Sequence, residues 1–373
     1  MSIGRRGLLG GGALVLAGSA LAGCGKEAEA GQAAPTAGSV PAGSVKPTGT
    51  QQAGITRPSL PPPHLLSVVL DLTGAPGPIL AGLGTLILDL TGRSLDGVVA
   101  PEDLTVTVGI GPRLVTMAGA DLPGTEELPR YRREEIAERD RGGDLWLQIG
   151  GSNPVACSMA ASTLLAGLGE AAAVRWTQEG FRGRYEKTPD GHQAGRNLMG
   201  FTDGIVAPRS TEELDEGVWI SSPPPAADAT IAVLRRFRFD LAGWNALDTA
   251  AQAAAVGRDK ATARPLSGGT QIDLGAKTPD GHYRVAADAH ARRAHALDVG
   301  VPLMLRRAYS IAVPGPGLLF ISFQSTLRAF TATMARLDES DRMLDFTVAT
   351  AAATFLVLPG FDQRHPLGST LFG

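Results

Sequence analysis

Cysteine and aromatic residues are scarce in this 373-residue chain, which has two cysteines and 5% aromatic residues. Cys24 lies in a segment interpreted below as an export signal, which leaves Cys157 alone in the mature chain. The sequence therefore excludes an internal disulfide framework and a metal site built from cysteines. The net charge is only −3 and no long basic stretch occurs, so we expect no binding to nucleic acid.

Near the N-terminus, the apolar run Gly7–Ala22 is shorter than the roughly 20 apolar residues that span a bilayer. Arg5 and Arg6 precede this run and small residues follow it, which is the order of an export signal. The adjacent arginines resemble a twin-arginine signal. We predict that residues 1–24 are an export signal and that the protein is extracytoplasmic, either periplasmic or at the cell surface.

The signal ends in Leu-Ala-Gly-Cys at residues 21–24, which resembles a lipobox. In that interpretation Cys24 is lipidated and tethers the protein to a membrane, and the alternative is an ordinary cleaved signal with a chance cysteine. Residues 25–63 contain no aromatic residue and many Pro, Gly, Ala, Ser and Thr. Such a segment cannot bury enough apolar surface to offset its ordering, so we predict a disordered linker there.

From about residue 64, apolar periodicity alternates between strand and helix patterns. We predict strands at 65–70, 104–108, 144–149 and 173–178, with helices at 78–90 and 154–168. The order strand, helix, strand, strand, helix, strand is the ferredoxin-like plan. Asn153 followed by Pro154 is a favourable start for the second of these helices.

The second half repeats this plan loosely. We predict strands at 230–239, 303–313, 317–323 and 355–358, with helices at 326–337 and 342–350. The sequence therefore predicts an α+β fold of two ferredoxin-like halves, residues 64–215 and 216–373. Their antiparallel sheets would pack against each other, with peripheral helices, in the manner of a dimeric α/β barrel. The hexamer Lys-Thr-Pro-Asp-Gly-His, at 187–192 and 277–282, indicates two tight surface turns.

Three groups of residues are candidates for chemistry. Asp203 stands beside Gly204 in the loop 196–204, where glycines permit positive φ or a close approach of the backbone. The alternative is an aspartate that caps its own turn. Arg306 and Arg307 begin an apolar strand, where buried arginines require an anionic partner such as a haem propionate or a developing oxyanion. The alternative is a pair of charges on an edge strand.

The third group is the histidines, of which His290 and His295 lie in an Ala- and Arg-rich segment. A separation of five residues does not place two side chains on one helix face, so these two do not suit a shared metal ion. One neutral imidazole is enough to hold haem iron and leaves the opposite axial position open. The alternative for each histidine is a structural role in the core or at the surface.

These residues carry a resemblance to the dye-decolorizing (DyP-type) haem peroxidases, in the secreted branch that includes the iron-uptake deferrochelatase/peroxidases. The resemblance covers roughly residues 64–373. Residues 200–204, Gly-Phe-Thr-Asp-Gly, match the family's GxxDG motif, and Arg-Asn-Leu-Met precedes them. Further segments resemble family strands and loops, in chain order: 142–149, 174–181, 257–260 with 264–266, 305–310 and 317–324.

The resemblance implies haem b as cofactor. It implies that His290 is the proximal ligand, that Asp203 is the distal acid–base group, and that Arg306 is the distal arginine in contact with the cofactor. Phe320 is expected to contact the haem. The family usually has Asn-Pro where this chain has His295-Ala296, and His295 is the alternative ligand.

The implied function is a haem peroxidase that reduces hydrogen peroxide and oxidises dye-like or phenolic donors in one-electron steps. Small organic electron donors are the expected partners, and the sequence leaves open whether the chain forms a homo-oligomer. One alternative is a haem-handling protein of iron uptake that releases iron, as a deferrochelatase does. Another is a non-catalytic solute-binding lipoprotein. A chlorite dismutase-like activity is more remote, because that family lacks the GxxDG segment.

Overall fold

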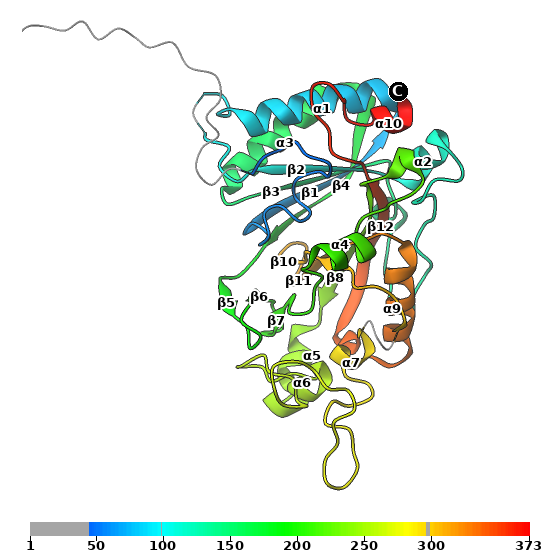
Figure 1. The fold of residues 1–373 in the computed structure, drawn as a ribbon. Coiled ribbons are helices and arrows are strands. Elements are labelled where there is room, and N and C mark those ends of the chain that lie inside the picture. The colour runs from blue at the N-terminus through cyan, green and yellow to red at the C-terminus, as the bar shows by residue number, and fades with distance from the viewer. Residues whose placement is uncertain (1–44, 98, 296–298) are drawn as a thin grey trace, which may run out of the picture. The chain divides into compact units, whose positions relative to one another are not determined.

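The computed structural model describes residues 45–373, except residue 98 and residues 296–298 (Figure 1). The predicted export signal, residues 1–24, and the predicted linker as far as residue 44 lie outside the described residues. Among the described residues, no helix is both long and apolar enough to cross a membrane.

The first half of the fold has the predicted ferredoxin-like order, and its four strands pair antiparallel in the order β4-β1-β3-β2. Pro at the first position starts both main helices, and the Asn153 side chain also accepts hydrogen bonds from the backbone N–H groups of Val155 and Ala156. The elements are β1 (His64–Leu72), α1 (Pro76–Gly92), β2 (Thr105–Ile110), α2 (Pro112–Ala118), η1 (Glu138–Asp140), β3 (Leu145–Gly151), α3 (Pro154–Leu168), η2 (Gly169–Ala171) and β4 (Ala172–Phe181).

A connecting segment carries a small three-stranded sheet. Its elements are β5 (Tyr185–Lys187), β6 (Gln193–Arg196), β7 (Thr202–Asp203), α4 (Thr211–Gly217) and η3 (Pro224–Ala226). The second half contains β8 (Thr230–Phe239), α5 (Leu241–Ala246), α6 (Thr249–Val256), α7 (His290–Arg293), β9 (Leu305–Arg306), β10 (Tyr309–Ile311), β11 (Gly317–Gln324), α9 (Leu327–Ser340), η4 (Leu344–Phe346), β12 (Thr347–Val357) and α10 (Ser369–Phe372).

Edge strands join the two halves into one closed sheet. The second half has the order β12-β8-β11-β10, which matches the order of the first half. Strand β12 pairs with β2, through Leu356 opposite Ile110, and β10 pairs with β4, through Ser310 opposite Phe181. The α+β, barrel-like architecture of two antiparallel halves is thus confirmed.

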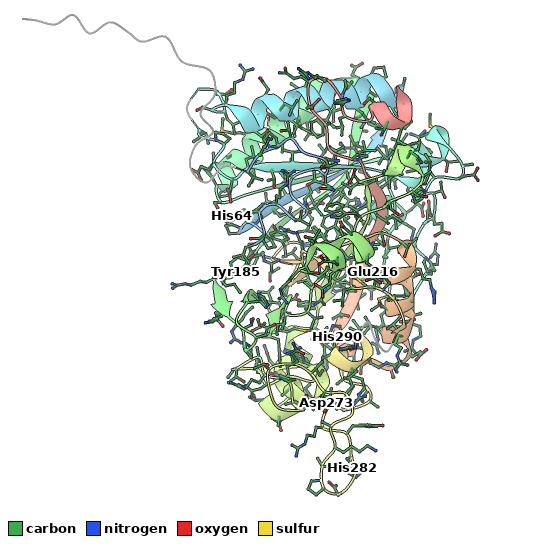
Figure 2. The ribbon with its side chains drawn as sticks, in the orientation of Figure 1. His64, Tyr185, Glu216, Asp273, His282 and His290 are labelled. Carbon is green, nitrogen blue, oxygen red and sulfur yellow. The ribbon has the colours of Figure 1, made fainter. Side chains whose placement is uncertain are left out.

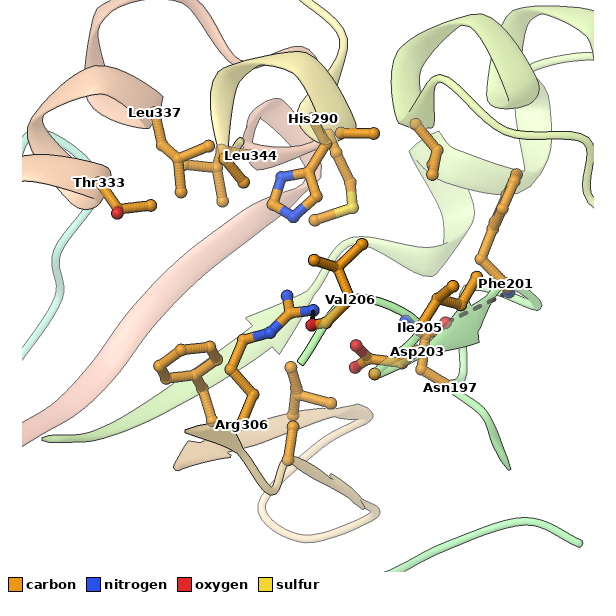
Figure 3. Close-up of a pocket in the computed structure, with 18 of the residues that line it drawn as sticks. Asn197, Phe201, Asp203, Ile205, Val206, His290, Arg306, Thr333, Leu337 and Leu344 are labelled. Carbon is orange, nitrogen blue, oxygen red and sulfur yellow. Dashed lines mark hydrogen bonds between the residues drawn. The ribbon is translucent and has the colours of Figure 1, made fainter. Parts of the chain in front are cut away.

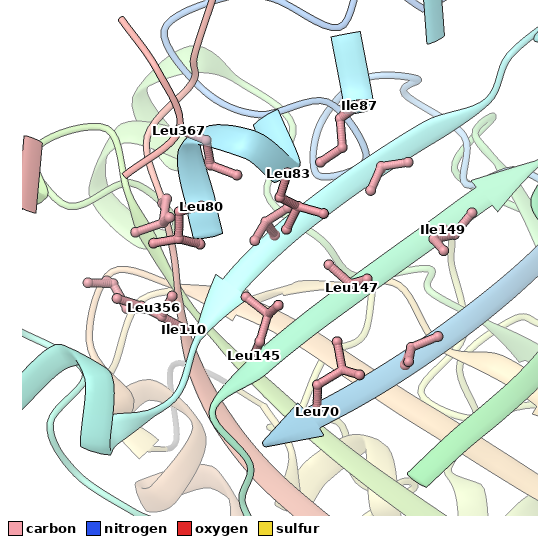
Figure 4. Packing of buried hydrophobic residues seen from close by; sticks show 14 of the residues in the cluster. Leu70, Leu80, Leu83, Ile87, Ile110, Leu145, Leu147, Ile149, Leu356 and Leu367 are labelled. Carbon is pink, nitrogen blue, oxygen red and sulfur yellow. The ribbon is translucent and has the colours of Figure 1, made fainter. Parts of the chain in front are cut away.

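The outer face of the first half is a densely packed core. Leu80, Leu83 and Ile87 of α1 are buried against strand residues such as Leu145 and Leu147 (Figure 4). Leu367 of the C-terminal segment belongs to the same cluster and packs beside Gly84 of α1. Burial of this apolar surface is the main term that holds α1 and α3 on the sheet.

The predicted linker ends earlier than residue 63. Gln52 is 1% exposed, and its side-chain amide donates hydrogen bonds to the carbonyl oxygens of Val108 and Leu358 at 2.9 and 2.8 Å. Ile55 is also buried. The prediction was wrong here because hydrogen bonds to the short seam between β2 and β12 order a segment that has few apolar residues of its own.

Two other predictions in the second half were wrong. The helix expected at 342–350 is a short 3-10 turn followed by the start of β12. Pairing with β8 along ten residues outweighs the helical preference of the alanines, and Thr347, Val348 and Thr350 favour a strand. The single strand expected at 303–313 is divided into β9 and β10, which both pair with β11 in one register, and β10 also pairs with β4 through Ser310.

Candidate active site

A cavity of about 230 Å³ lies on the outer face of the second half. Its walls come from the sheet, from α7 and α9, and from the segment 197–206. Most of its lining is apolar, and the charged or titratable groups are few: Asp203, Arg258, His290, His295 and Arg306. An apolar concave site with a small number of polar groups is the usual form of a cofactor pocket.

His290 is the first residue of α7, and its imidazole points into this cavity (Figure 3). Its Nδ1 lies 2.6 Å from Oδ2 of Asp341, whose side chain is fully buried. The other carboxylate oxygen of Asp341 accepts hydrogen bonds from the N–H groups of Met343 and Leu344, at 2.8 and 3.1 Å. A carboxylate held in this way requires the proton on Nδ1, which leaves the Nε2 lone pair free to bind a metal.

Asp203 lies in β7, opposite Gly195 of β6. The turn between these strands is fixed by Asn197, whose side-chain oxygen accepts a hydrogen bond from the N–H of Met199 at 3.0 Å. Gly200 has a φ of +86°, and a Cβ at this position would lie 2.6 Å from Cε of Lys260. The first glycine of the GxxDG motif is therefore required by its backbone conformation, whereas the flexible end of the Lys260 side chain could shift to admit a Cβ.

The two adjacent arginines of the predicted strand point in different directions. Arg306 lines the cavity, and its Nη2 donates to the carbonyl oxygen of Val206 at 3.0 Å. Arg307 is buried elsewhere and donates to the carbonyl oxygen of Pro58 at 2.6 Å. Burial lowers the pKa of Arg307 to about 10. Of the pair, only Arg306 is placed to meet a ligand in the cavity.

The structure brings the predicted site residues together. Asp203 and Arg306 lie on the side of the cavity that faces the His290 imidazole (Figure 3). Phe320 is also in the wall, packed against Phe330 with ring centroids 5.9 Å apart, and His295 lines the same cavity. In contrast, His282 lies in the exposed turn 277–282 (Figure 2), as the sequence predicts.

Two residues of the site were not predicted. Asp341 was not predicted, because no sequence pattern connects positions 290 and 341. Arg258 is 8% exposed and lines the cavity, and burial lowers its pKa. The sequence signal that could have identified Arg258 is its position in the segment 257–260, which resembles a family loop. Among the described residues, no group of three or more His, Cys, Asp or Glu side chains could hold a metal ion.

The side chains present fit a haem. One imidazole nitrogen faces an apolar cavity, as an axial ligand must. Arg258 and Arg306 place positive charge at the same cavity, which suits the carboxylates of a porphyrin. Asp203 places a carboxylate on the side of the cavity that faces the imidazole.

Comparisons with known proteins agree with this geometry. Residues 89–182 match the model of the Dyp-type peroxidase N-terminal domain, and residues 194–362 match that of the C-terminal domain. A dye-decolorizing peroxidase of Thermobifida fusca is 29% identical over 73% of this chain and 68% of its own length. A deferrochelatase of Yersinia pseudotuberculosis is 28% identical over 73% of this chain and 67% of its own length.

Solved structures show the same likeness. A DyP-type peroxidase from Cellulomonas bogoriensis is 31% identical, with a TM-score of 0.77 over 88% of this chain and 98% of that one. Ferric DtpA from Streptomyces lividans is 28% identical, with a TM-score of 0.79 over 88% of this chain and 96% of that one. These matches do not support the non-catalytic lipoprotein. The chain belongs to the Dyp-type peroxidase family and is a haem-dependent peroxidase.

Proposed function

We propose that His290 is the axial haem ligand, that Asp203 is the acid–base group for peroxide, and that Arg306 stabilises charge in the same step. The observation that carries this proposal is the arrangement in Figure 3, where the His290 imidazole faces Asp203 and Arg306 across one cavity. Asp341 orients the imidazole through the 2.6 Å contact at Nδ1. His295 stays the alternative ligand, since it lines the cavity as well.

When bound, the haem supplies an iron that can hold peroxide and accept its oxidising equivalents. The chain's own residues move the proton of peroxide and stabilise the negative charge that develops on it. The Asp203 carboxylate takes the proton from the near oxygen of peroxide and returns it to the far oxygen, which leaves as water. The Arg306 guanidinium stabilises the negative charge that develops as the O–O bond breaks. Because a carboxylate is the shuttle, we expect an acidic activity optimum.

Hydrogen peroxide and large dyes are expected to react in different places. A cavity of about 230 Å³ that also held a haem would have little room for a bulky dye. Large donors therefore deliver electrons at the protein surface, whereas hydrogen peroxide reaches the cavity itself. The natural donor class that we propose is small phenolic or dye-like molecules.

The substitution Asp203→Asn tests the assignment. We expect the variant to keep its haem absorption and to lose about 100-fold or more of its rate with peroxide, the usual size of an acid–base contribution. Asp280→Asn is the matched control, since this aspartate lies in the exposed turn 277–282. A wild-type rate in Asp203→Asn, measured by stopped-flow absorbance, would show that another group transfers the proton.

Iron release is the second candidate function, and it is favoured by the similarity to proteins named deferrochelatase. The same cavity and axial ligand would serve both reactions. Product analysis separates them: oxidised donor together with intact haem indicates peroxidase activity, and free porphyrin indicates iron release. We propose peroxidase activity as the main function because the reaction with peroxide gives a role to both Asp203 and Arg306 in the cavity wall.

We also propose that the protein is exported by the twin-arginine route and tethered to a membrane through Cys24. Arg5, Arg6 and the Leu-Ala-Gly-Cys sequence support this. Replacing both arginines with lysine is expected to retain the protein in the cytoplasm. Cys24→Ala is expected to release it from the membrane fraction into the soluble extracytoplasmic fraction. Immunoblots of cell fractions measure both outcomes.

A further inference from the structure

The side chain of Arg196 links two loops that border the cavity. The first loop is residues 197–204 and the second is residues 257–263. Its Nη1 donates to the carbonyl oxygens of Gly200 and Lys260, at 3.0 and 2.6 Å. Its Nη2 donates to the carbonyl oxygen of Ala261 at 2.8 Å, and its Nε donates to Glu186 at 3.0 Å. Four of the five N–H groups of the guanidinium are thus used. Three of these contacts are to backbone oxygens, and they come from both loops.

Each loop brings a cavity residue with it. The first loop leads from Arg196 to Asp203, and the strands on either side pair Arg196 with Thr202 and Gly195 with Asp203. The second loop begins at Gly257, whose φ is +88°, and contains Arg258 in the cavity wall. Arg196 therefore connects the backbone that carries the carboxylate to the backbone that carries a buried guanidinium.

The second loop is held in its conformation by hydrogen bonds of its own, independently of Arg196. The carboxylate of Asp259 accepts hydrogen bonds from the N–H and the hydroxyl of Thr262, at 2.7 and 2.6 Å. The N–H of Ala263 donates to the carbonyl oxygen of Asp259 at 2.9 Å. This tight turn presents two successive carbonyl oxygens, those of Lys260 and Ala261, to one guanidinium.

We propose that Arg196 is a positioning residue for the peroxide reaction, which holds Asp203 in its place facing His290 across the cavity by fixing the loop 197–204 to the turn 257–263. The proposal rests on the proposed role of Asp203. Lysine cannot replace this arginine, because an ammonium group lacks the planar fork that reaches three carbonyl oxygens at once. The contact to Glu186 contributes little, since that carboxylate is 52% exposed.

The test compares Arg196→Ala and Arg196→Lys with a matched control in the haem-loaded protein. The control is Arg264→Ala, which removes the side chain of an exposed arginine that directly follows this turn and makes one 3.4 Å contact to the carbonyl oxygen of Gly269. We expect both Arg196 variants to keep their haem content and to react with peroxide about 10- to 100-fold more slowly, as a displaced catalytic group does. The control is expected to react at the wild-type rate.

Two further measurements separate positioning from a loss of stability. Hydrogen exchange, followed by mass spectrometry, is expected to quicken in residues 197–204 and 257–263 of the Arg196 variants and not in strands β8 and β11. In the Asp203→Asn background, Arg196→Ala is expected to slow the peroxide reaction by less than twofold more, because its effect passes through Asp203. If Arg196→Ala slowed the peroxide reaction by the same factor in the Asp203→Asn background as in the wild-type background, the proposal would be overturned.

The outcomes distinguish this inference from the proposed function. If Asp203→Asn reacts at the wild-type rate, the assignment of Asp203 fails, whatever Arg196 does. If Asp203→Asn is slow and Arg196→Ala reacts at the wild-type rate, the positioning role fails alone. Should Arg196→Ala not fold, Asp259→Ala loosens the same turn from the other side, and a wild-type peroxide rate in that variant would also overturn the proposal.

Discussion

In the first half of the molecule, α1 connects β1 to β2 and lies on the outer face of the sheet, where Leu80, Leu83 and Ile87 are buried. In the second half, the corresponding connection from β8 is residues 240–304, and the structure places His290 in it. The strand order of the two halves is the same. The shorter β1–β2 connection thus covers the outer face of the first half with helix α1. The longer connection 240–304 leaves a cavity between the sheet and the helices of the second half.

The helices that follow β3 and β11 show the same contrast. Helix α3 buries small residues such as Ala156, Ala160 and Ala161 against the first sheet. The corresponding helix α9 turns Phe330 and Met334 toward the cavity instead. From this comparison we propose that side chains on the outer face of the first half mainly stabilise the fold, and that those lining the cavity of the second half bind the ligand. Substitutions can test this division.

The largest expected effect is at His290. We expect His290→Ala to lose the axial bond and to slow peroxide turnover at least about 1,000-fold, which corresponds to about 4 kcal/mol of activation free energy. His282→Ala is the matched control, because its side chain is 82% exposed. The Soret spectrum and the peroxide rate measure the effect. A normal spectrum in His290→Ala would transfer the ligand assignment to His295.

The second prediction compares one residue from each outer face in the haem-free protein. Leu83→Ala is expected to lower the free energy of unfolding by about 3 kcal/mol, since Leu83 is 2% exposed in a packed cluster. Phe320→Ala is expected to cost only about 1 kcal/mol, because this ring borders an existing cavity and its removal leaves less new void.

Urea denaturation measures both free energies, and a haem titration of the same variants measures affinity. We expect Phe320→Ala to weaken haem binding about tenfold, a change of about 1.4 kcal/mol, and Leu83→Ala to leave it unchanged. Equal losses of stability in the two variants would show that the second face is packed like the first, and the contrast between the halves would not hold.

The third prediction concerns Asp341. Asparagine keeps an oxygen for the N–H groups of Met343 and Leu344, but it presents an amide NH₂ to the imidazole of His290. The imidazole must then carry its proton on the nitrogen that faces the cavity. We expect a 10- to 100-fold loss of haem affinity or peroxide rate. Asp345→Asn is the control, since that carboxylate is 53% exposed, and equal behaviour of the two variants would contradict the prediction.

The sequence could predict features that depend on local interactions, but it could not predict those that depend on long-range contacts. The helix at 154–168 was predicted to the residue, because Asn153, Pro154 and a regular apolar pattern act locally. The GxxDG loop was found because glycine conformation leaves a local signature. The strand from Thr347 was predicted as a helix, since its pairing with β8 is a long-range contact. Asp341 was missed for the same reason, because only the fold brings it to His290.

The smallest expected effect is a pH-dependent loss of stability in the first half. Burial disfavours the charged form of Asp144, but hydrogen bonds from Arg113, at 2.7 Å, and from the N–H of Leu72, at 2.8 Å, outweigh it. The pKa of Asp144 is therefore lowered from its ordinary value. A carboxyl group with a lowered pKa stabilises the fold above the unfolded-state pKa of about 4, and this contribution is lost as the pH falls further.

We expect Asp144→Asn to lower the free energy of unfolding by about 1 kcal/mol at pH 7, a modest value because Arg113 is 55% exposed. The difference from wild type should shrink as the pH falls below about 4, when the wild-type carboxylate takes up its proton. Asp89→Asn, at an exposed pair on α1, is the control and should show little change at any pH. The peroxide rate of Asp144→Asn at pH 7 should equal that of wild type, because neither Asp144 nor Arg113 lines the cavity that contains His290 and Asp203. A slower rate would mean that the first half also contributes to the reaction.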